Sequence, residues 1–287
     1  MNYVLVLINY KPDYLIHTIN TILSVDKDAK IYLFSDKKIE YKNIEFINLH
    51  DINSKNASEF LSLDIYKTSI FEENPLWKTA SLRVFYLSEI LDYLKINSFV
   101  HFDNDVLIYK SFSEIENKII KRKFNITQSN SKNLVFGYSY IDNNKEIRKI
   151  SDLVLEQIKL GLKNNWSSNN GKPENEMQLL GSVYKKNIDL FNLLPILPYD
   201  SDIIFDPSSY GQFIDGTHNK PKKFYNKGFT SLNTIIGNEI VSKRLKVKFK
   251  DNKPTVIWKN NIYDIANLHV HSKRLNKFLP KNYKKYI

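Results

Sequence analysis

Two aspartates, separated by one residue, follow a short apolar run in the first half of the chain. Asp103-Asn104-Asp105 comes directly after residues 98–102, which we interpret as a buried strand. In open α/β sheets, ligands bind beyond the carboxyl ends of the strands. Carboxylates one residue apart on an extended turn can reach the same hard cation, and their oxygens suit Mg²⁺ or Mn²⁺. The pattern therefore predicts a divalent metal site, and such a cation would in turn hold a diphosphate.

A second group with useful spacing lies near the C-terminus. His269, His271 and Lys273 alternate with other residues, so in an extended segment their side chains would face the same side. Either histidine could offer a neutral imidazole nitrogen, and the lysine ammonium could pair with a diphosphate.

Alternating strand and helix patterns in the first half would position the aspartates. The order is typical of βαβ units, which implies an α/β fold with a parallel, doubly wound sheet. We expect strands at residues 3–8, 30–34, 44–49 and 98–102, and helices at residues 13–23 and 76–94. The second helix leads directly into the strand that ends at the aspartates.

The second half is less regular. No internal repeat or long linker divides the chain, so we expect one domain, with residues 1–112 and 113–287 as its two halves. We expect strands at residues 133–140, 254–258 and 265–270, helices at 147–163 and 177–184, an extended piece at 193–199 and a mobile polar loop at 164–175.

Composition excludes several classes of protein. With 287 residues and 42% hydrophobic residues, the chain can bury a large core. The absence of cysteine excludes disulfides, thiolate metal sites and a cysteine nucleophile, and it fits a reducing cytoplasm. The N-terminus does not resemble a signal peptide, and no apolar run reaches the roughly 18 residues of a membrane helix. We therefore expect a cytoplasmic protein.

All of the net charge lies near the C-terminus. Residues 243–287 contain 13 lysines and arginines against two aspartates, and the whole chain carries a net charge of +11. This segment could attract an anionic membrane face or an anionic substrate, or it could simply be a solvated basic surface. We expect no nucleic-acid partner because the segment has no known nucleic-acid-binding signature.

Taken together, three motifs resemble a known family. The Asp-X-Asp after a strand, the upstream helix that contains Arg83, and the late His-X-His-Ser-Lys string resemble nucleotide-sugar-dependent glycosyltransferases of the GT-A fold, of the bacterial polysaccharide-synthesis type. The resemblance implies a Rossmann-type sandwich with a mostly parallel central sheet. It also implies a nucleotide-sugar-binding first half, residues 1–112, and an acceptor-binding second half, residues 113–287.

The same resemblance implies ligands for these residues. Mn²⁺ or Mg²⁺ would be held by the two aspartates and by one of the two histidines. The donor would be a nucleoside-diphosphate sugar, with a UDP-sugar favoured, and the acceptor a glycan or lipid-linked hydroxyl in surface polysaccharide synthesis. The residues implied to bind the donor are Asn9, Tyr10 and Asp36 at the nucleobase, Lys78 and Arg83 at ribose or phosphate, Asp103, Asn104 and Asp105 around the metal, and Lys273 at the diphosphate; the implied metal ligands are Asp103, Asp105, His269 and His271.

Two further carboxylates are candidates for catalysis. Asp215 lies in a polar, glycine-containing string, residues 205–218, that resembles an acceptor-side loop. Glu176 lies where a helix begins, so it could instead be a favourable helix-terminus charge. If the reaction inverts the anomeric centre, one of them would take the acceptor proton; if it retains, they would position substrates.

Two other functions remain open at this point. A nucleotidyltransferase that makes nucleotide sugars would share a related sheet, but it would ordinarily carry a glycine-rich loop after the first strand, and residues 9–13 contain no glycine. In a non-enzymatic carbohydrate-binding protein, the two aspartates would merely cap a turn. Metal-dependent turnover of a nucleotide sugar separates an enzyme from that protein.

Overall fold

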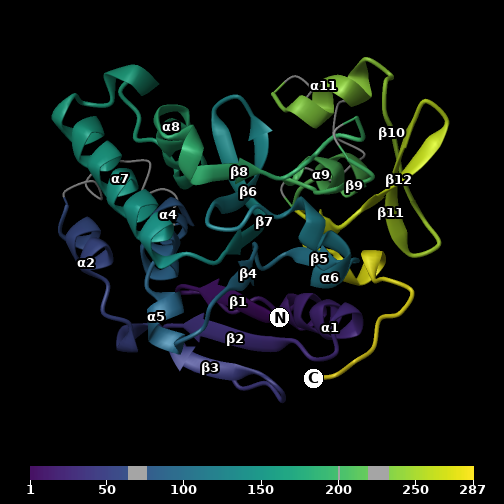
Figure 1. The fold of residues 1–287 in the computed structure, drawn as a ribbon, viewed down its shortest axis with the longest axis horizontal. Coiled ribbons are helices and arrows are strands. Elements are labelled where there is room, and N and C mark those ends of the chain that lie inside the picture. Colours follow the sequence, from purple (N-terminus) through teal and green to yellow (C-terminus); the bar gives the residue numbers. More distant parts are fainter. Residues whose placement is uncertain (64–75, 200, 219–232) are drawn as a thin grey trace.

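A seven-stranded mixed sheet lies at the centre of the protein (Figure 1). The computed structural model describes residues 1–63, 76–199, 201–218 and 233–287. Four of the six neighbouring strand pairs are parallel, which confirms the expected α/β class with a mostly parallel sheet. In spatial order the strands are β3 (Glu45–Asn48), β2 (Lys30–Ser35), β1 (Asn2–Leu7), β4 (Phe99–His101), β7 (Asn133–Ile141), β6 (Phe124–Asn130) and β8 (Phe191–Leu193).

The first strand shows why this sheet must be covered on both faces. Alternate residues of β1 enter two different cores: Tyr3 and Leu5 pack on one face, Val4 and Val6 on the other, and all four are buried. A parallel strand buried on both faces has a continuous apolar sequence. Since the strand itself is apolar, polar residues that could bind a ligand lie beyond its carboxyl end.

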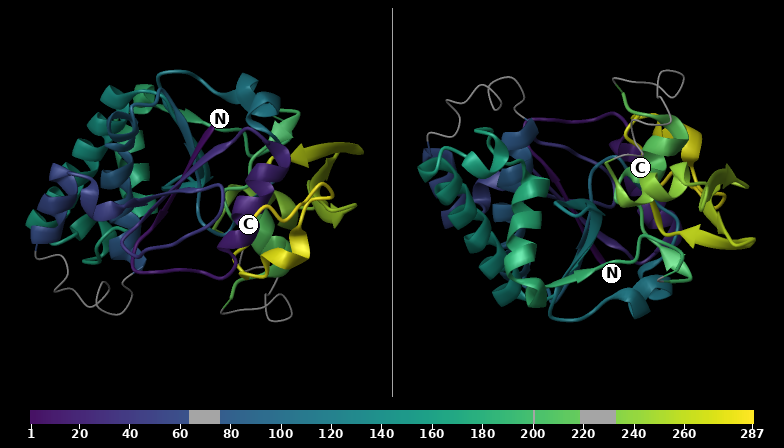
Figure 2. Two further views of the ribbon diagram at one scale, coloured as in Figure 1. Left: turned by 90° about the horizontal axis from the view of Figure 1, so that it is seen from below. Right: turned by 90° about the horizontal axis from the view of Figure 1, so that it is seen from above.

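Helices cover one face of the sheet, and the opposite face packs against α1 (Leu15–Val25) and the C-terminal elements (Figure 2). The first helical layer comprises α2 (Lys55–Ser62), α4 (Leu76–Leu87), α5 (Ile90–Leu94), α7 (Asn144–Lys163) and α8 (Glu176–Lys186). Ser54 caps the first of these helices, because its hydroxyl accepts a hydrogen bond from a backbone amide of the first turn.

The single helix expected over residues 76–94 is in fact two helices. The α4 helix ends at Leu87, and α5 begins at Ile90. The Ser88 hydroxyl donates a hydrogen bond to the Phe85 carbonyl at 2.7 Å, and this local bond competes with the helical pattern. Both pieces bury apolar residues in the same core, so the hydrophobic period continues across the break and hides it in the sequence.

The second half of the chain adds a smaller sheet. Its order is β10 (Lys246–Lys250), β11 (Lys253–Trp258), β12 (Asn261–Ile265) and β9 (Ile203–Ile204). The expected strands at 133–140 and 254–258 and helices at 147–163 and 177–184 are present, with small shifts of their ends. β6, β10 and the helix α9 (Ser209–Asp215) were not expected; α9 occupies the string expected to be a loop.

A separate two-stranded sheet joins the segment of the late histidines to the residues that follow the two aspartates. The strand β13 (Asn267–His269) pairs antiparallel with β5 (Val106–Ile108), and His269 lies opposite Val106. Because β5 begins directly after the two aspartates, this register places His269 close to them.

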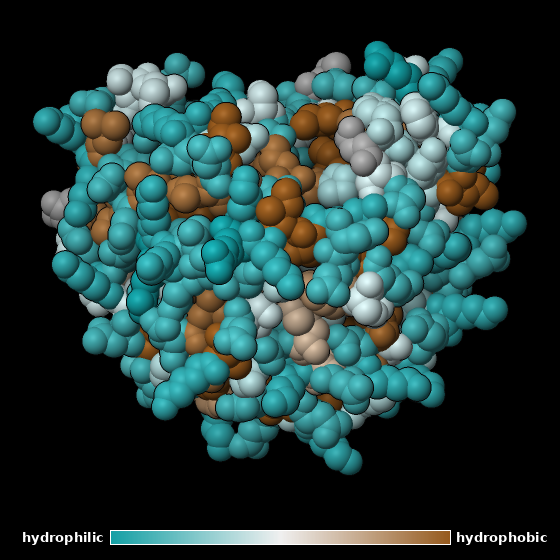
Figure 3. Space-filling model, in the orientation of Figure 1, coloured by the Kyte–Doolittle hydropathy of each residue, from teal (hydrophilic) through white to brown (hydrophobic). Residues whose placement is uncertain are grey.

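The surface on the face shown in Figure 3 is mostly hydrophilic, with hydrophobic residues in separate patches. Among the described residues, no helix has the length and apolar character needed to cross a bilayer.

Candidate active site

The turn that carries the two aspartates, residues 103–105 (the acidic turn), is fixed by hydrogen bonds from three elements. The Asp103 amide donates to the carbonyl of Phe136 on β7 at 2.8 Å. The hydroxyl of Thr18 on α1 donates to the Asn104 carbonyl at 2.8 Å, and the Asn104 side-chain amide donates to Val6 at 3.2 Å. The middle residue, predicted to contact the donor, therefore anchors the turn to β1 through its amide nitrogen.

Residues 267–273, the histidine segment, place both histidines on the same side, as their spacing predicts. The rings of His269 and His271 stack with centroids 4.4 Å apart. Nε2 of His269 lies 3.0 Å from a carboxylate oxygen of Asp105 and 3.7 Å from one of Asp103. The Val270 amide donates to the Asp105 carbonyl at 2.8 Å, so backbone and side chain both join this segment to the acidic turn.

A buried aspartate that the sequence analysis missed holds the histidine segment in place. The Asp206 carboxylate accepts hydrogen bonds from the amides of Tyr210, Gly211 and His269, at 2.9, 2.9 and 3.0 Å. A Cβ at Gly211 would lie 1.9 Å from the His269 carbonyl oxygen, so only glycine permits this approach. In the sequence, Gly211 within the polar string of residues 205–218 was the feature that indicated such a close approach.

Lys273 completes the cluster from the solvent side. Its ammonium forms an ion pair with Asp105, and it also lies 5.6 Å from the centre of the Tyr14 ring. Tyr14 was not a predicted site residue. Its hydroxyl accepts a hydrogen bond from the hydroxyl of Tyr10 at 3.2 Å, which connects the end of β1 with the acidic turn.

The buried charges stabilise one another. Burial alone would raise the pKa of Asp105, but His269 and Lys273 outweigh it and hold that pKa well below its usual range. For His269, burial is outweighed by Asp105, which raises the imidazole pKa. Burial, together with the neighbouring His269, lowers the pKa of His271 to about 3, so this second imidazole is neutral and can offer a nitrogen lone pair.

The cluster has the donor chemistry of a divalent metal site. Among the described residues, Asp105, His269 and His271 offer ligand atoms that all lie within 4.8 Å of one another, and Asp103 adds a carboxylate beside His269. Nδ1 of His269 is buried, and no described residue forms a hydrogen bond with it. Carboxylate oxygens suit Mg²⁺ and Mn²⁺, and imidazole nitrogens suit transition-metal ions.

Arg83 extends the cluster toward a further carboxylate. Its guanidinium donates to Asp103 and, at 2.9 Å, to Glu176, and it lies 4.6 Å from the centre of the Phe136 ring. Glu176 is the first residue of α8 and is 4% exposed. Burial and the nearby Asp103 raise the pKa of Glu176 to about 7, despite the opposing charge of Arg83.

The other residues expected to bind the donor lie at two places. The Asn9 amide donates to both carboxylate oxygens of Asp36, at 2.8 and 2.9 Å, so the ends of β1 and β2 meet as expected. Tyr10 beside them is 48% exposed. Lys78 lies on α4, five residues before Arg83, and its contact with a donor stays a prediction.

Asp215, the other candidate for catalysis, forms an ion pair. Its carboxylate accepts hydrogen bonds from Arg274 at 2.6 and 2.9 Å and from the hydroxyl of Ser272 at 2.5 Å. This pairing links the end of α9 to the residues on either side of Lys273. A base role for this carboxylate stays a prediction, and the contacts observed here are those of a residue that positions the histidine segment.

No protein-family model and no curated protein sequence matches this chain. Solved structures with a related fold include the galactosyltransferase LgtC in complex with donor and acceptor sugar analogues, at 15% identity and a TM-score of 0.44, over 74% of this chain and 78% of that one. Mouse xyloside xylosyltransferase 1 is 8% identical, with a TM-score of 0.45, over 68% and 85%. The glycosyltransferase GlyE of Streptococcus pneumoniae is 13% identical, with a TM-score of 0.41, over 67% of this chain and 44% of its own.

Proposed function

We propose that this protein is a metal-dependent glycosyltransferase that moves a sugar from a nucleoside-diphosphate sugar to a hydroxyl of a glycan or lipid-linked acceptor. The observation that carries this proposal is the meeting of the acidic turn with the histidine segment. Two carboxylates, two imidazoles and an ammonium gather at the carboxyl end of β4, although more than 160 residues separate Asp105 from Lys273 in the sequence.

The residues that would hold Mn²⁺ or Mg²⁺ are Asp103, Asp105, His269 and His271. When bound, such a cation supplies Lewis-acid stabilisation to the diphosphate as it departs. Arg83 and His269 oppose the charge of Asp103, and His269 and Lys273 oppose that of Asp105. The Lys273 side chain is 32% exposed and would pair with an oxygen of the diphosphate.

Glu176 is the better placed of the two candidate catalytic carboxylates. A single guanidinium joins it to Asp103, whereas Lys273 pairs with Asp105. A carboxylate with a pKa near 7 can accept a proton at neutral pH. In an inverting reaction Glu176 would take the acceptor proton, and in a retaining reaction it would position the transferred sugar.

The nucleotide would lie along the ends of β1 and β2. The exposed Tyr10 ring offers a surface on which a base can stack, and Asp36 with Asn9 borders it. Tyr14 then connects this end with Lys273 and the acidic turn. A UDP-sugar is the first donor to test.

The basic surface supports a location at the inner face of the membrane. Lys246, Lys248 and Lys250 are exposed along β10, an edge strand, while the residues between them are half-buried. A row of lysines on one side of a strand attracts anionic lipid headgroups. We propose that the protein works in the cytoplasm as a peripheral protein at such a surface, in surface polysaccharide synthesis.

A screen of nucleotide sugars with Mn²⁺ or Mg²⁺, following release of the nucleoside diphosphate, tests the proposal. We expect slow release from one donor, dependent on metal and lost in Asp105→Asn. Asp189→Asn, which changes an exposed aspartate, is the matched control and should leave release unchanged. Sugar binding without any turnover would instead favour a carbohydrate-binding protein, and pyrophosphate release from a nucleoside triphosphate would favour a nucleotidyltransferase.

A further inference from the structure

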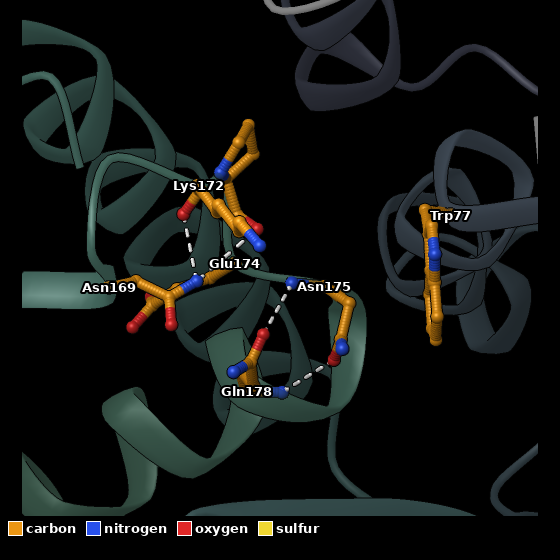
Figure 4. A pocket seen from close by; sticks show the side chains of 7 residues that line it. Trp77, Asn169, Lys172, Glu174, Asn175 and Gln178 are labelled. Carbon is orange, nitrogen blue, oxygen red and sulfur yellow. Dashed lines mark hydrogen bonds between the residues drawn. The ribbon is translucent and has the colours of Figure 1, made fainter. Parts of the chain in front are cut away.

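A pocket beside the proposed catalytic carboxylate has a lining that suits a sugar ring. It lies between the first turn of α4 and the segment that leads into α8, and its volume is about 200 Å³. Trp77 forms one wall, with the flat face of its indole toward the opposite side (Figure 4). The opposite wall is polar, and the side chains that line the pocket with the indole are Asn169, Lys172, Pro173, Glu174, Asn175 and Gln178.

We propose that this pocket is the subsite for one pyranose ring of the acceptor glycan, next to the sugar that receives the transferred group. The proposal rests on the proposed function, and it specifies which part of the acceptor the enzyme binds in this pocket. Sugar rings have apolar C–H faces that pack on aromatic rings and hydroxyl edges that exchange hydrogen bonds with amides. A tryptophan face opposite asparagine and glutamine side chains offers both.

The polar wall is held rigidly by its own hydrogen bonds. Asn175 and Gln178 form a reciprocal cap at the start of α8, with bonds of 3.0 and 3.1 Å. The Asn169 side-chain amide donates to the Lys172 carbonyl at 2.7 Å. The Glu174 carboxylate accepts weak bonds from Gln157 and Ser182, both at 3.3 Å. A wall ordered before binding loses little entropy when the ligand arrives.

The position of the pocket assigns it to the acceptor rather than to the nucleotide. Trp77 and Arg83 belong to the same helix, six residues apart, and so lie roughly 9 Å apart along its axis. Across from them, Glu176 follows Asn175 directly. The pocket thus borders the Arg83–Glu176 pair, whereas the Tyr10 hydroxyl bonds to Tyr14, whose ring lies beside Lys273.

The size of the pocket limits what it can hold. Pockets for drug-sized ligands usually exceed roughly 300 Å³, and this one is smaller. A single ring fits it, so longer acceptors would extend outward into solvent. Lys172 and Glu174 bring one charge of each sign to the wall, which favours a neutral hexose over a strongly charged sugar.

Acceptor kinetics with Trp77 variants test the proposal. The probes are aryl glycosides of glucose, galactose and N-acetylglucosamine, with transfer measured at saturating donor and binding of the same glycosides followed by saturation-transfer NMR. In Trp77→Ala we expect the acceptor KM to rise about tenfold, the scale of one lost aromatic contact, with a much smaller change in the donor KM. Trp77→Phe keeps an aromatic face and should stay within about threefold of the wild type. Trp258→Phe, on the other sheet, is the matched control and should show no change.

The outcomes separate this proposal from the proposed function. If the wild type hydrolyses a nucleotide sugar but neither binds nor glycosylates any probe, or if Trp77→Ala leaves the acceptor KM unchanged, the subsite is wrong and the glycosyltransferase stands. If no nucleotide sugar is turned over, yet the probes bind and Trp77→Ala abolishes the binding, the pocket is a sugar site in a protein that is not a glycosyltransferase.

Discussion

The acidic turn with its histidine segment and the lysine-bearing edge strand β10 are both rich in charge, but they use it in opposite ways. At the turn, Asp105 is 4% exposed and each charge has a partner of the opposite sign within the cluster. Along β10, three lysines of the same sign point to solvent. Buried charges act strongly on one another and on a ligand, whereas exposed charges are screened by water and salt. We therefore expect chemistry at the turn and, at most, attraction of a surface at the strand.

The largest expected effect is the loss of a metal-binding carboxylate. Asp105→Asn keeps the shape of the side chain but removes the charge that His269 and Lys273 face. We expect donor turnover to fall by at least about 100-fold, the scale of losing one preorganised electrostatic partner. Steady-state release of the nucleoside diphosphate at saturating Mn²⁺ measures it. A loss of turnover below fivefold would show that Asp105 is not a metal ligand.

The next effect separates the two candidate carboxylates. Glu176→Gln should lower kcat by about 100-fold or more if this residue handles the acceptor proton. Asp215→Asn should cost about tenfold or less, because that carboxylate positions the histidine segment through Arg274. Measuring kcat for both variants with the same donor and acceptor gives the comparison. The reverse order would assign the base role to Asp215.

The raised pKa of Glu176 also predicts a pH dependence of stability. The folded protein holds this proton up to about pH 7, whereas an unfolded glutamate loses it near 4.5. Between these values the folded state binds more protons, so this residue makes the protein less stable as the pH rises. Thermal unfolding from pH 4.5 to 7.5 should show that this loss is smaller in Glu176→Gln than in the wild type. Parallel curves for the two proteins would contradict the raised pKa.

The smallest expected effect on catalysis comes from the exposed strand. Changing Lys246, Lys248 and Lys250 together to glutamate should leave turnover of a soluble donor within about twofold, because none of these side chains contacts the cluster. The same change should weaken sedimentation with anionic liposomes at low salt, since it reverses the attraction to lipid headgroups. Unchanged liposome binding would show that these lysines are a solvated edge and do not attract the membrane.

The sequence predicted the first strands of the central sheet and the acidic turn well because their signals are local. Strand β1 is apolar throughout, and the aspartates follow a strand directly. The spacing of the two histidines predicted that they share a side, and they do. That they meet the aspartates depends on the pairing of β13 with β5, a contact between distant parts of the chain that no local pattern records.

The parts that could not be predicted are those set by tertiary contacts. Gly211 indicated a close backbone approach, but nothing in the sequence showed that Asp206 would hold three backbone amides or that Tyr14 would lie beside Lys273. The Arg83 guanidinium was expected at a ribose or phosphate, and its bridge between Asp103 and Glu176 appears only once α4 and α8 pack together.

The most direct test of the central claim is a calorimetric titration of UDP with and without Mn²⁺, in the wild type and in His269→Ala. We predict that Mn²⁺ tightens UDP binding at least tenfold in the wild type, and that this gain is largely lost in the variant, because in the proposed site the histidine segment and the acidic turn would hold one cation together. UDP binding that is unaffected by Mn²⁺, or a gain that survives intact in His269→Ala, would contradict the shared site.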